Sequence, residues 1–258
     1  MQEKPKVSLI LTSYNCKDNI KQTLKSIEMQ TYPDIEVIIV DGASADGTVD
    51  VIKKFAKSTK YECKWTSEKD KGIYNAMNKG YYLSSGEVVA FFNDLFLTKH
   101  AVSFMIEAIY REHADGAHAD LIYATDQKVK RYWRMGQGSI KCGWMPGHPT
   151  LYLKREIYDN YGVYKEEYKC SADYEFMVRI LKDNRVKLVY VPKTIIRMYY
   201  GGTSTAGVNN YLLSLKEAHK ALTDNNIKGA WLIDMMRTVR VVLQFLCVWK
   251  YNANEWKE

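Results

Sequence analysis

The first hundred residues alternate continuous apolar runs with amphipathic segments. Apolar runs occupy residues 7–14, 34–44 and 86–94, with a shorter one at 61–68, and they end in polar residues. Such runs are typical of parallel strands buried on both faces. Between them apolar residues recur at helical spacing, as Ile20, Leu24 and Ile27 do, and Asp46 can cap the helix that carries Ile52. This alternation predicts βαβ units in a doubly wound, mostly parallel central sheet flanked by helices, which is an α/β fold.

Beyond residue 100 the pattern is less regular. It predicts a helix over 99–112, strands of an antiparallel addition over 119–127 and 130–139, and then short helices. A strand pair is expected at 186–200, followed by two helices within 208–258. We therefore predict one mixed α/β domain at residues 1–206, with halves at 1–100 and 101–206, and a C-terminal helical extension at 207–258.

Polar side chains gather where the predicted strands end. These ends are Thr12 to Asn15, Asp41-Gly42, Glu68 to Lys71 and Asn93-Asp94. Ligands of doubly wound sheets bind beyond such ends, so we expect one shared crevice. Neither GxGxxG nor GxxxxGK[ST] follows the first strand, which disfavours a dinucleotide site and a P-loop. Tyr14 has a ring that can stack on a nucleotide base, and Asp41 can accept a hydrogen bond from a ring N–H of that base. Structural roles fit equally well, with Tyr14 as an aromatic residue in a turn and Asp41 as a cap.

Charge and cysteine usage narrow the setting. The net charge is +7 with a pI near 8.9, which favours anionic partners such as nucleotides or anionic lipid, and we expect no nucleic acid. The first fifteen residues have too short an apolar stretch for a signal peptide. The 5 cysteines are scattered without a CxxC pair, so neither zinc nor a disulfide framework is expected. These features predict a cytoplasmic protein with reduced thiols.

Several ordered motifs resemble one enzyme family. They are "SLILTSYN", "QTYPDIEVIIVDGASADGT", "SEKDKGIYNAMNKG" and "SSGEVVAFFND", followed by "GWMPGHPTLYLKREIYDNYG", "SADYEFMVRILK" and "GGTS". Over roughly residues 5–205 the chain resembles the family 2 glycosyltransferases of bacterial surface-polysaccharide synthesis, which have the GT-A fold. The resemblance implies inverting transfer of a sugar from a UDP- or GDP-sugar to a glycan or lipid-linked acceptor. Residues 1–100 would then bind the nucleotide, and 101–206 the acceptor.

The resemblance also implies which residues hold the donor. They are Thr12, Tyr14, Asn15, Asp41, Asp70, Lys71 and Asn93. Asp70 and Lys71 precede a predicted helix, whose N-terminus favours anions such as a pyrophosphate. Many members read Asp-Asp-Gly-Ser where this chain has Asp41-Gly42-Ala43-Ser44, so one carboxylate remains to read the base.

The segment "FFNDLF" is where the family holds its metal. Members usually read Asp-X-Asp or Asn-X-Asp-Asp there, and an ungapped alignment puts Leu95 and Phe96 at the carboxylate positions. With one residue deleted, Asp94 becomes the ligand, beside Asn93 for the ribose or sugar. Mg²⁺ often takes one or two protein carboxylates and completes its shell with phosphates and water. We expect a weakly held Mn²⁺ or Mg²⁺ at Asp94, with a metal-free enzyme as the alternative.

The resemblance implies that Asp173, in "SADYEFMVRIL", is the catalytic base; without the resemblance, a helix-start aspartate with no chemical role is the better interpretation. Ser171 is expected as the N-cap, which puts Asp173 in the first helical turn, where the helix dipole keeps a carboxylate ionised. A general base at neutral pH must be ionised, and this position matches the base of the family. On the acceptor side we expect His148 as a hydrogen-bonding group and Trp144 as a stacking ring, although a histidine beside proline equally fits a structural role.

The C-terminal segment 231–251 is amphipathic. Arg237, Arg240 and Gln244 share one helical face, and no apolar run approaches the ~20 residues that span a bilayer. The helix either lies on anionic lipid as a peripheral contact or packs on its own domain.

Two other functions stay open. A nucleotidyltransferase shares the α/β core but should carry a Gly-rich loop after the first strand, and "TSYNCKDN" has no Gly. The other is a degenerate module that binds nucleotide or scaffolds a synthesis complex. The single carboxylate of "FFNDLF" supports it.

Overall fold

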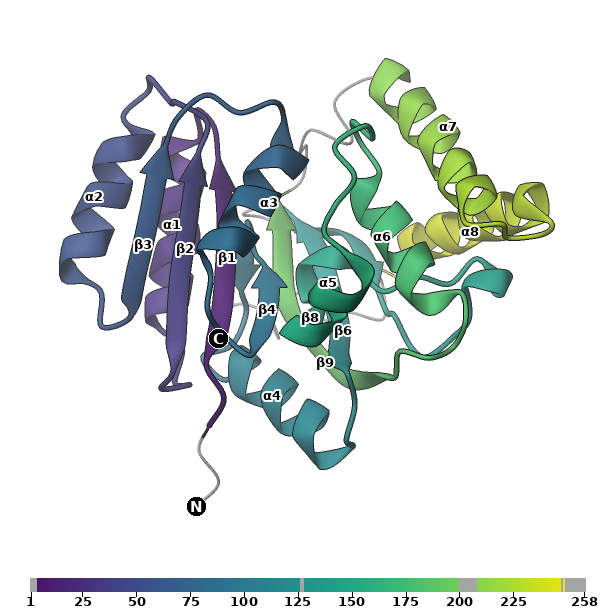
Figure 1. Cartoon of the computed structure of the whole chain (residues 1–258), viewed down its shortest axis with the longest axis horizontal. Helices are drawn as coiled ribbons and strands as arrows, with labels where there is room; N and C mark the ends of the chain where they lie inside the picture. Colours follow the sequence, from purple (N-terminus) through teal and green to yellow (C-terminus); the bar gives the residue numbers. More distant parts are fainter. Residues whose placement is uncertain (1–3, 126–127, 200–207, 247, 249–258) are drawn as a thin grey trace.

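The structure, a computed structural model, describes residues 4–125, 128–199, 208–246 and 248. Within them a 9-stranded sheet runs in the order β3-β2-β1-β4-β8-β6-β9-β5, and β7 pairs with β6. Helices cover both faces of the sheet (Figure 1). The predicted α/β class, with a mostly parallel central sheet and a helical C-terminal segment, is confirmed.

The first half contains the predicted βαβ units. Its elements are β1 (Val7–Ser13), α1 (Lys17–Glu28), β2 (Ile35–Asp41), α2 (Thr48–Ser58), β3 (Glu62–Ser67), α3 (Ile73–Leu83) and β4 (Val88–Phe91). All the pairings among β3, β2, β1 and β4 are parallel. The register places Ser13 beside Asp41, and Asp41 beside Ser67. Three polar strand ends therefore lie level at one edge of the sheet.

The second half reverses direction at β8. Its elements are β5 (Leu95–Phe96), α4 (Ala101–Arg111), β6 (Gly116–Ala124), β7 (Val129–Trp133), β8 (Tyr152–Lys154), α5 (Arg155–Tyr161), α6 (Ala172–Leu181) and β9 (Leu188–Tyr199), with short 3-10 turns η1 (Ile140–Cys142) and η2 (His148–Thr150). Strand β8 is antiparallel to both β4 and β6, so β6 runs parallel to β4. Strand β9 continues the sheet parallel to β6, and β5 and β7 are antiparallel additions.

The predicted strand pair at 186–200 is wrong, because the segment forms the single strand β9. Its register against β6 steps from Val191 opposite Ala119 to Thr194 opposite Asp120. Pro192 has no N–H to donate to the ladder, so the strand bulges there instead of turning back.

Apolar side chains of the central strands alternate between two cores. Leu9 and Leu11 of β1 pack with the core that α1, α2 and α4 cover, whereas Ile10 packs with the core beneath α3, α5 and α6. Because both faces are covered, the strands read as continuous apolar runs in the sequence.

Two helices follow the sheet, as predicted. Helix α7 (Val208–Asp224) packs against α6, and α8 (Ala230–Leu246) packs against α7, β7 and η1 (Figure 1). The predicted boundary at 206/207 and the "GGTS" motif at 201–204 lie outside the described residues. In the part of the chain that is described, each helix is too short or too polar to cross a bilayer.

Candidate active site

Asp41 joins three strand ends. Its Oδ1 accepts hydrogen bonds from Ser13 Oγ at 2.9 Å and Ser44 Oγ at 2.5 Å, and its Oδ2 from Ser44 N at 2.8 Å and Ser67 Oγ at 2.7 Å. Burial raises the pKa of Asp41, but the hydrogen bonds from Ser44, Ser67 and Ser13 outweigh it and lower the pKa below its ordinary value. Both carboxylate oxygens are thus engaged, and one of these donors has to move before Asp41 accepts from a base.

Tyr14 and Asp70 approach each other over Gly42. A Cβ built on Gly42 would lie 2.8 Å from Asp70 Oδ2 and 3.2 Å from Tyr14 Cδ2, so a side chain here would displace one of them. The Tyr14 side chain is 67% exposed and offers a face on which a flat ring can stack.

Asn15 ties the loop after β1 to the loop after β2. Its backbone N–H donates to Ser44 Oγ at 2.8 Å, and its Oδ1 accepts from Ala45 N at 2.9 Å. Asn15 and Ala43 both have left-handed backbones, with φ of 44° and 62°. The Asn15 side chain therefore holds the two loops together.

Thr12 and Asn93 close the edge between β1 and β4. Thr12 N donates to Asn93 Oδ1 at 2.9 Å, and Asn93 Nδ2 donates to Thr12 Oγ1 at 2.9 Å.

The loop before α3 is held by a hydrogen bond from Gly72 N to Asp70 Oδ1 at 2.8 Å. Lys71 is exposed beside a small pocket at the start of this helix, as the prediction of a cation at a helix N-terminus requires.

Asp94 is a buried carboxylate, 8% exposed. Burial raises its pKa to about 7, and a hydrogen bond from the backbone N–H of Tyr199 opposes the shift. A divalent cation would supply charge that favours the ionised form, so Asp94 fits the predicted role of one metal ligand. Among the described residues no group of three His, Cys, Asp or Glu side chains gathers.

Asp173 lies in the first turn of α6, as predicted. Tyr74 of α3 donates from its hydroxyl to Asp173 Oδ1 at 2.9 Å. This hydrogen bond ties the start of α6 to the helix that follows Asp70 and Lys71. Burial raises the pKa of Tyr123 on β6, Arg131 opposes the shift, and the charges of Asp94 and Asp173 raise the pKa further.

His148 lies on the same side as Asp173. Its Nε2 is 2.7 Å from the Tyr164 hydroxyl, and its ring stacks on Phe91 at 5.8 Å between centroids. Burial lowers the pKa of His148, and the charge of Asp173 opposes the shift. The structure packs His148 against Tyr164 and Phe91, and its contact with an acceptor stays a prediction.

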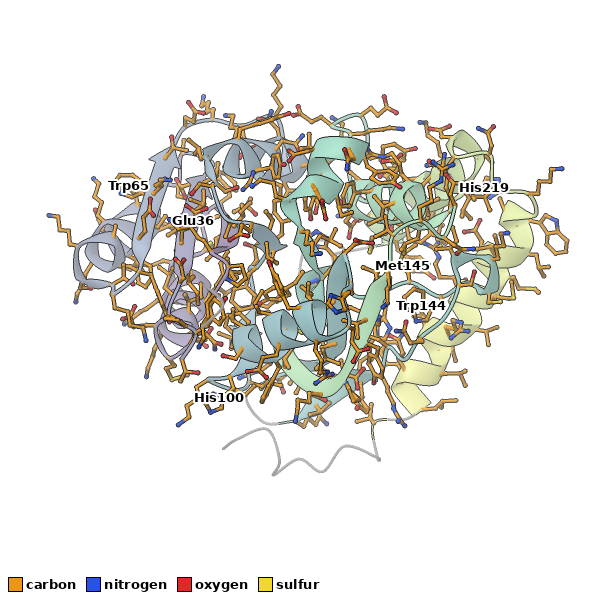
Figure 2. All side chains as sticks on the ribbon, turned by 60° about the horizontal axis from the view of Figure 1, so that its bottom comes forward. Glu36, Trp65, His100, Trp144, Met145 and His219 are labelled. Carbon is orange, nitrogen blue, oxygen red and sulfur yellow. The ribbon has the colours of Figure 1, made fainter. Side chains whose placement is uncertain are left out.

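Trp144 is placed elsewhere. Its side chain is 5% exposed, its Nε1 donates to Met135 O at 2.9 Å, and its ring meets His118 edge-on. It lines a pocket with Leu181 at the C-terminal end of α6, whereas Asp173 lies at the N-terminal end. Figure 2 shows Trp144 and Met145 on the side of the molecule opposite Glu36. The structure therefore gives Trp144 a core position, and its contact with an acceptor stays a prediction.

Helix α7 holds the start of the α6 helix. Glu217 Oε1 accepts from Lys169 N at 2.7 Å, and Oε2 accepts from Cys170 N at 2.8 Å and Ser171 N at 3.0 Å. Ser171 is the N-cap, as predicted, but its hydroxyl contacts Ser214 instead of capping the helix.

Sequence reasoning missed Tyr74, Tyr123, Tyr164 and Glu217. Glu217 is 46 residues away from Ser171 along the chain, and no local pattern marks it. The chain has 20 tyrosines, so residue type alone singles out none of the three.

Comparison with known proteins identifies the family of this chain. The sequence profile described as "Glycosyl transferase family 2" matches residues 8–168. A PGL/p-HBAD biosynthesis glycosyltransferase of Mycobacterium bovis is 26% identical over 217 residues, which cover 81% of this chain and 83% of that protein. An uncharacterised glycosyltransferase of Nostoc is 30% identical over 127 residues, 48% of this chain and 39% of that protein.

Solved structures share the fold. S. aureus TarS 1-349 in complex with UDP-GlcNAc has a TM-score of 0.69 and 18% identity, covering 91% of this chain and 72% of that chain. The mannosyltransferase PcManGT from Pyrobaculum calidifontis, in complex with GDP-Man and Mn²⁺, has a TM-score of 0.68 and 15% identity. The match covers 98% of this chain and 78% of that chain. The profile match spans more than half of the sequence, so this chain belongs to glycosyl transferase family 2 and is a glycosyltransferase with the GT-A fold.

Proposed function

We propose that this enzyme is an inverting glycosyltransferase that moves a sugar from a nucleoside-diphosphate sugar to a hydroxyl of a glycan or lipid-linked acceptor in surface-polysaccharide synthesis. One observation carries the proposal: the Tyr74 hydroxyl, on the helix that follows Asp70 and Lys71, donates to Asp173 Oδ1 at 2.9 Å, so the carboxylate at the start of α6 contacts the first half of the chain. A carboxylate beside the proposed donor edge can serve as the base for an acceptor hydroxyl.

The donor lies along the strand ends of the first half. The base stacks on the exposed ring of Tyr14, and Thr12, Asn15, Asp41, Asp70 and Asn93 form the polar edge around the nucleoside and sugar. The exposed Lys71 faces the diphosphate from the start of α3. The two fold relatives with bound UDP-GlcNAc and GDP-Man support a UDP- or GDP-class donor.

Asp94 would hold a divalent cation, Mn²⁺ or Mg²⁺, and a bound cation would supply charge that stabilises the leaving diphosphate. Its carboxylate is buried, so water screens its charge little. The presence of Mn²⁺ in the mannosyltransferase relative supports this role.

Asp173 takes the proton of the acceptor hydroxyl. The hydroxyl oxygen then forms a bond to the anomeric carbon as the bond to the diphosphate breaks on the opposite face, which inverts the configuration. Tyr74 fixes one carboxylate oxygen through its 2.9 Å hydrogen bond, so the other oxygen faces the acceptor. His148 and Tyr164 border the acceptor next to Asp173.

Release of nucleoside diphosphate from UDP- and GDP-sugars by the purified enzyme tests this function. We expect Mn²⁺ or Mg²⁺ to raise donor affinity, and Asp94→Ala to abolish that increase. Glu107→Ala, an exposed carboxylate on α4, is the matched control and should behave as wild type. Equal donor affinity with a chelator, with metal and in Asp94→Ala would favour the metal-free alternative.

The same assay separates the other two functions. A nucleotidyltransferase would release pyrophosphate from a nucleoside triphosphate, and a binding or scaffold module would bind donor without turnover. The reaction is proposed to take place in the cytoplasm at the inner face of the membrane, where a lipid-linked acceptor can be reached.

A further inference from the structure

The outer face of α8 is apolar and exposed. Its exposed large side chains are 40% to 69% accessible; they are Trp231, Leu232, Met235, Val239, Val242, Leu243, Phe245 and Leu246. They recur over the whole length of the 17-residue helix. An exposed apolar surface of this extent on one element marks an interaction site more often than an ordinary surface.

The opposite face of α8 docks on the domain and is mixed in character, because it buries Ala230, Ile233 and Gln244. Arg240 Nε donates to Cys142 O at 3.0 Å, and Arg131 Nε of β7 donates to Gln244 Oε1 at 2.6 Å. Gly143 allows this approach, because a Cβ there would lie 2.5 Å from the backbone N of Arg237. The polar side chains of the helix thus contact the domain, while its larger apolar side chains stay exposed.

The exposed charge of the C-terminal segment is mostly positive. In the described residues 210–246 the exposed basic side chains are Lys216, Lys220, Lys228 and Arg240. The exposed carboxylate in this segment is that of Asp224, which is paired with Lys220 at 2.5 Å. On α8 itself the exposed charge is that of Arg240, so nothing acidic interrupts the apolar face.

We propose that the outer face of α8 lies on an anionic lipid surface, parallel to the membrane plane. The helix is about 26 Å long at ~1.5 Å per residue, and its tryptophan, phenylalanine and leucines are side chains that enter the boundary between headgroups and acyl chains. Lys228, which is exposed just before the start of α8, would contact anionic headgroups.

The inner face of α8 reaches the proposed acceptor side. The guanidinium of Arg237 lies 4.7 Å from the ring centroid of Tyr174, the residue after Asp173. Arg131, which binds Gln244, lies 4.5 Å from the ring centroid of Tyr123. A membrane on the outer face would therefore present lipid-linked hydroxyls close to Asp173. This link to the acceptor rests on the proposed function, whereas lipid binding itself does not.

Cosedimentation with vesicles tests the surface. The full-length chain should bind vesicles of phosphatidylglycerol, should bind vesicles of phosphatidylcholine more weakly, and should lose part of the difference at high salt. The triple variant Met235→Gln, Val239→Gln, Val242→Gln removes apolar side chains that are 52%, 54% and 53% exposed. Its binding to phosphatidylglycerol should fall by at least about tenfold. Its melting temperature should not change.

Met29→Gln is the matched control, because Met29 is 52% exposed at the end of α1. Unchanged vesicle binding by the triple variant would overturn the proposal. The proposal would also be overturned if the wild type sediments as a dimer, the triple variant sediments as a monomer, and neither protein binds vesicles. Nucleoside diphosphate release without vesicles should be the same in wild type and triple variant. If release is absent in both while vesicle binding persists, the proposed function fails and the lipid surface stands.

Discussion

The two halves of the site are held together in different ways. In the first half, the polar side chains at the strand ends bind one another across adjacent parallel strands: Asp41 accepts from Ser13 and Ser67. In the second half, Asp173 depends on distant elements. Tyr74 of α3 binds its carboxylate, and Glu217 of α7 binds the backbone that leads into its helix.

The proposed donor edge and the proposed acceptor side therefore differ in how they form. Level strand ends follow from the sheet register, so the donor edge forms whenever the parallel strands form. The acceptor side forms only when α3, α6 and α7 have packed together. Substitutions should therefore act on stability in the first half and on catalysis in the second.

The largest effect is expected at Asp173. Asp173→Asn removes the proposed base, so transfer should fall by roughly 10²–10⁴, or about 2.7–5.5 kcal/mol of barrier. Donor affinity should stay nearly constant, because the residue faces the acceptor. Transfer rate, donor affinity and melting temperature are measured on one preparation. A well-folded variant that transfers sugar at the wild-type rate would refute the assignment.

Glu36 tests the first half. It is fully buried in β2 and accepts from Ser8 Oγ, Ser85 N and Gly86 N. Burial raises its pKa, but these hydrogen bonds outweigh it and lower the pKa from 4.5 to about 2. A lowered folded-state pKa stabilises the fold above pH 4.5, and this stabilisation is lost as the pH falls from 4.5 towards 2. It amounts to about 3 kcal/mol at about 1.36 kcal/mol per pKa unit.

Glu36→Gln should therefore lower the free energy of unfolding at pH 7 by about 3 kcal/mol and flatten its acid dependence. Denaturant unfolding from pH 7 to pH 3 measures both. Glu62→Gln on β3 is the control, since its side chain is 45% exposed and should change little. An unchanged acid slope in Glu36→Gln would assign the acid dependence to other carboxylates.

Much of the first half could be predicted from the sequence. The apolar runs and helical spacings located β1 to β4 and α1 to α3, because both faces of the parallel sheet are buried. The candidate residues Thr12, Asp41 and Asn93 fall at neighbouring strand ends for the same reason. What the sequence did not show is that these side chains already bind one another, since hydrogen bonds between strand ends depend on the register.

The second half could be predicted less well. Asp173 was located because a helix start is a local signal, but Tyr74 and Glu217 come from distant segments. Periodicity identified the polar face of α8 but not its direction, which depends on Gly143 and Cys142 of η1 and the loop that follows it. The bulge in β9 at Pro192 was taken for a turn, because both interrupt an apolar run.

Tyr74 tests the link between the halves. Tyr74→Phe keeps the ring but removes the hydroxyl that donates to Asp173 Oδ1. A hydrogen bond to a charged group contributes about 1.5–3 kcal/mol, so kcat should fall roughly 10- to 100-fold with little change in the donor KM.

Tyr81→Phe is the control for Tyr74→Phe. Tyr81 lies on the same helix and donates to Asp159 Oδ1 at 2.6 Å, away from Asp173. Tyr81→Phe should lose stability without a comparable fall in kcat. Equal kinetic effects of the two variants would show that Tyr74 acts through packing and not through the carboxylate of Asp173.

The smallest effect is expected at Ala43, in the loop after Asp41. Ala43 has a φ of 62°, a left-handed backbone that costs a residue with a Cβ about 1–2 kcal/mol. Ala43→Gly relieves this cost but gives the unfolded chain more freedom, so the net gain in the free energy of unfolding should be about 0.5–1 kcal/mol. Ala45→Gly, two residues on and without a positive φ, should instead lower stability by a similar amount. Denaturant unfolding at constant pH measures both, with donor affinity as a second readout. If the two glycines change stability in the same direction, the left-handed conformation of Ala43 is not a source of strain. The donor edge would then be held by its hydrogen bonds without the local cost at Ala43.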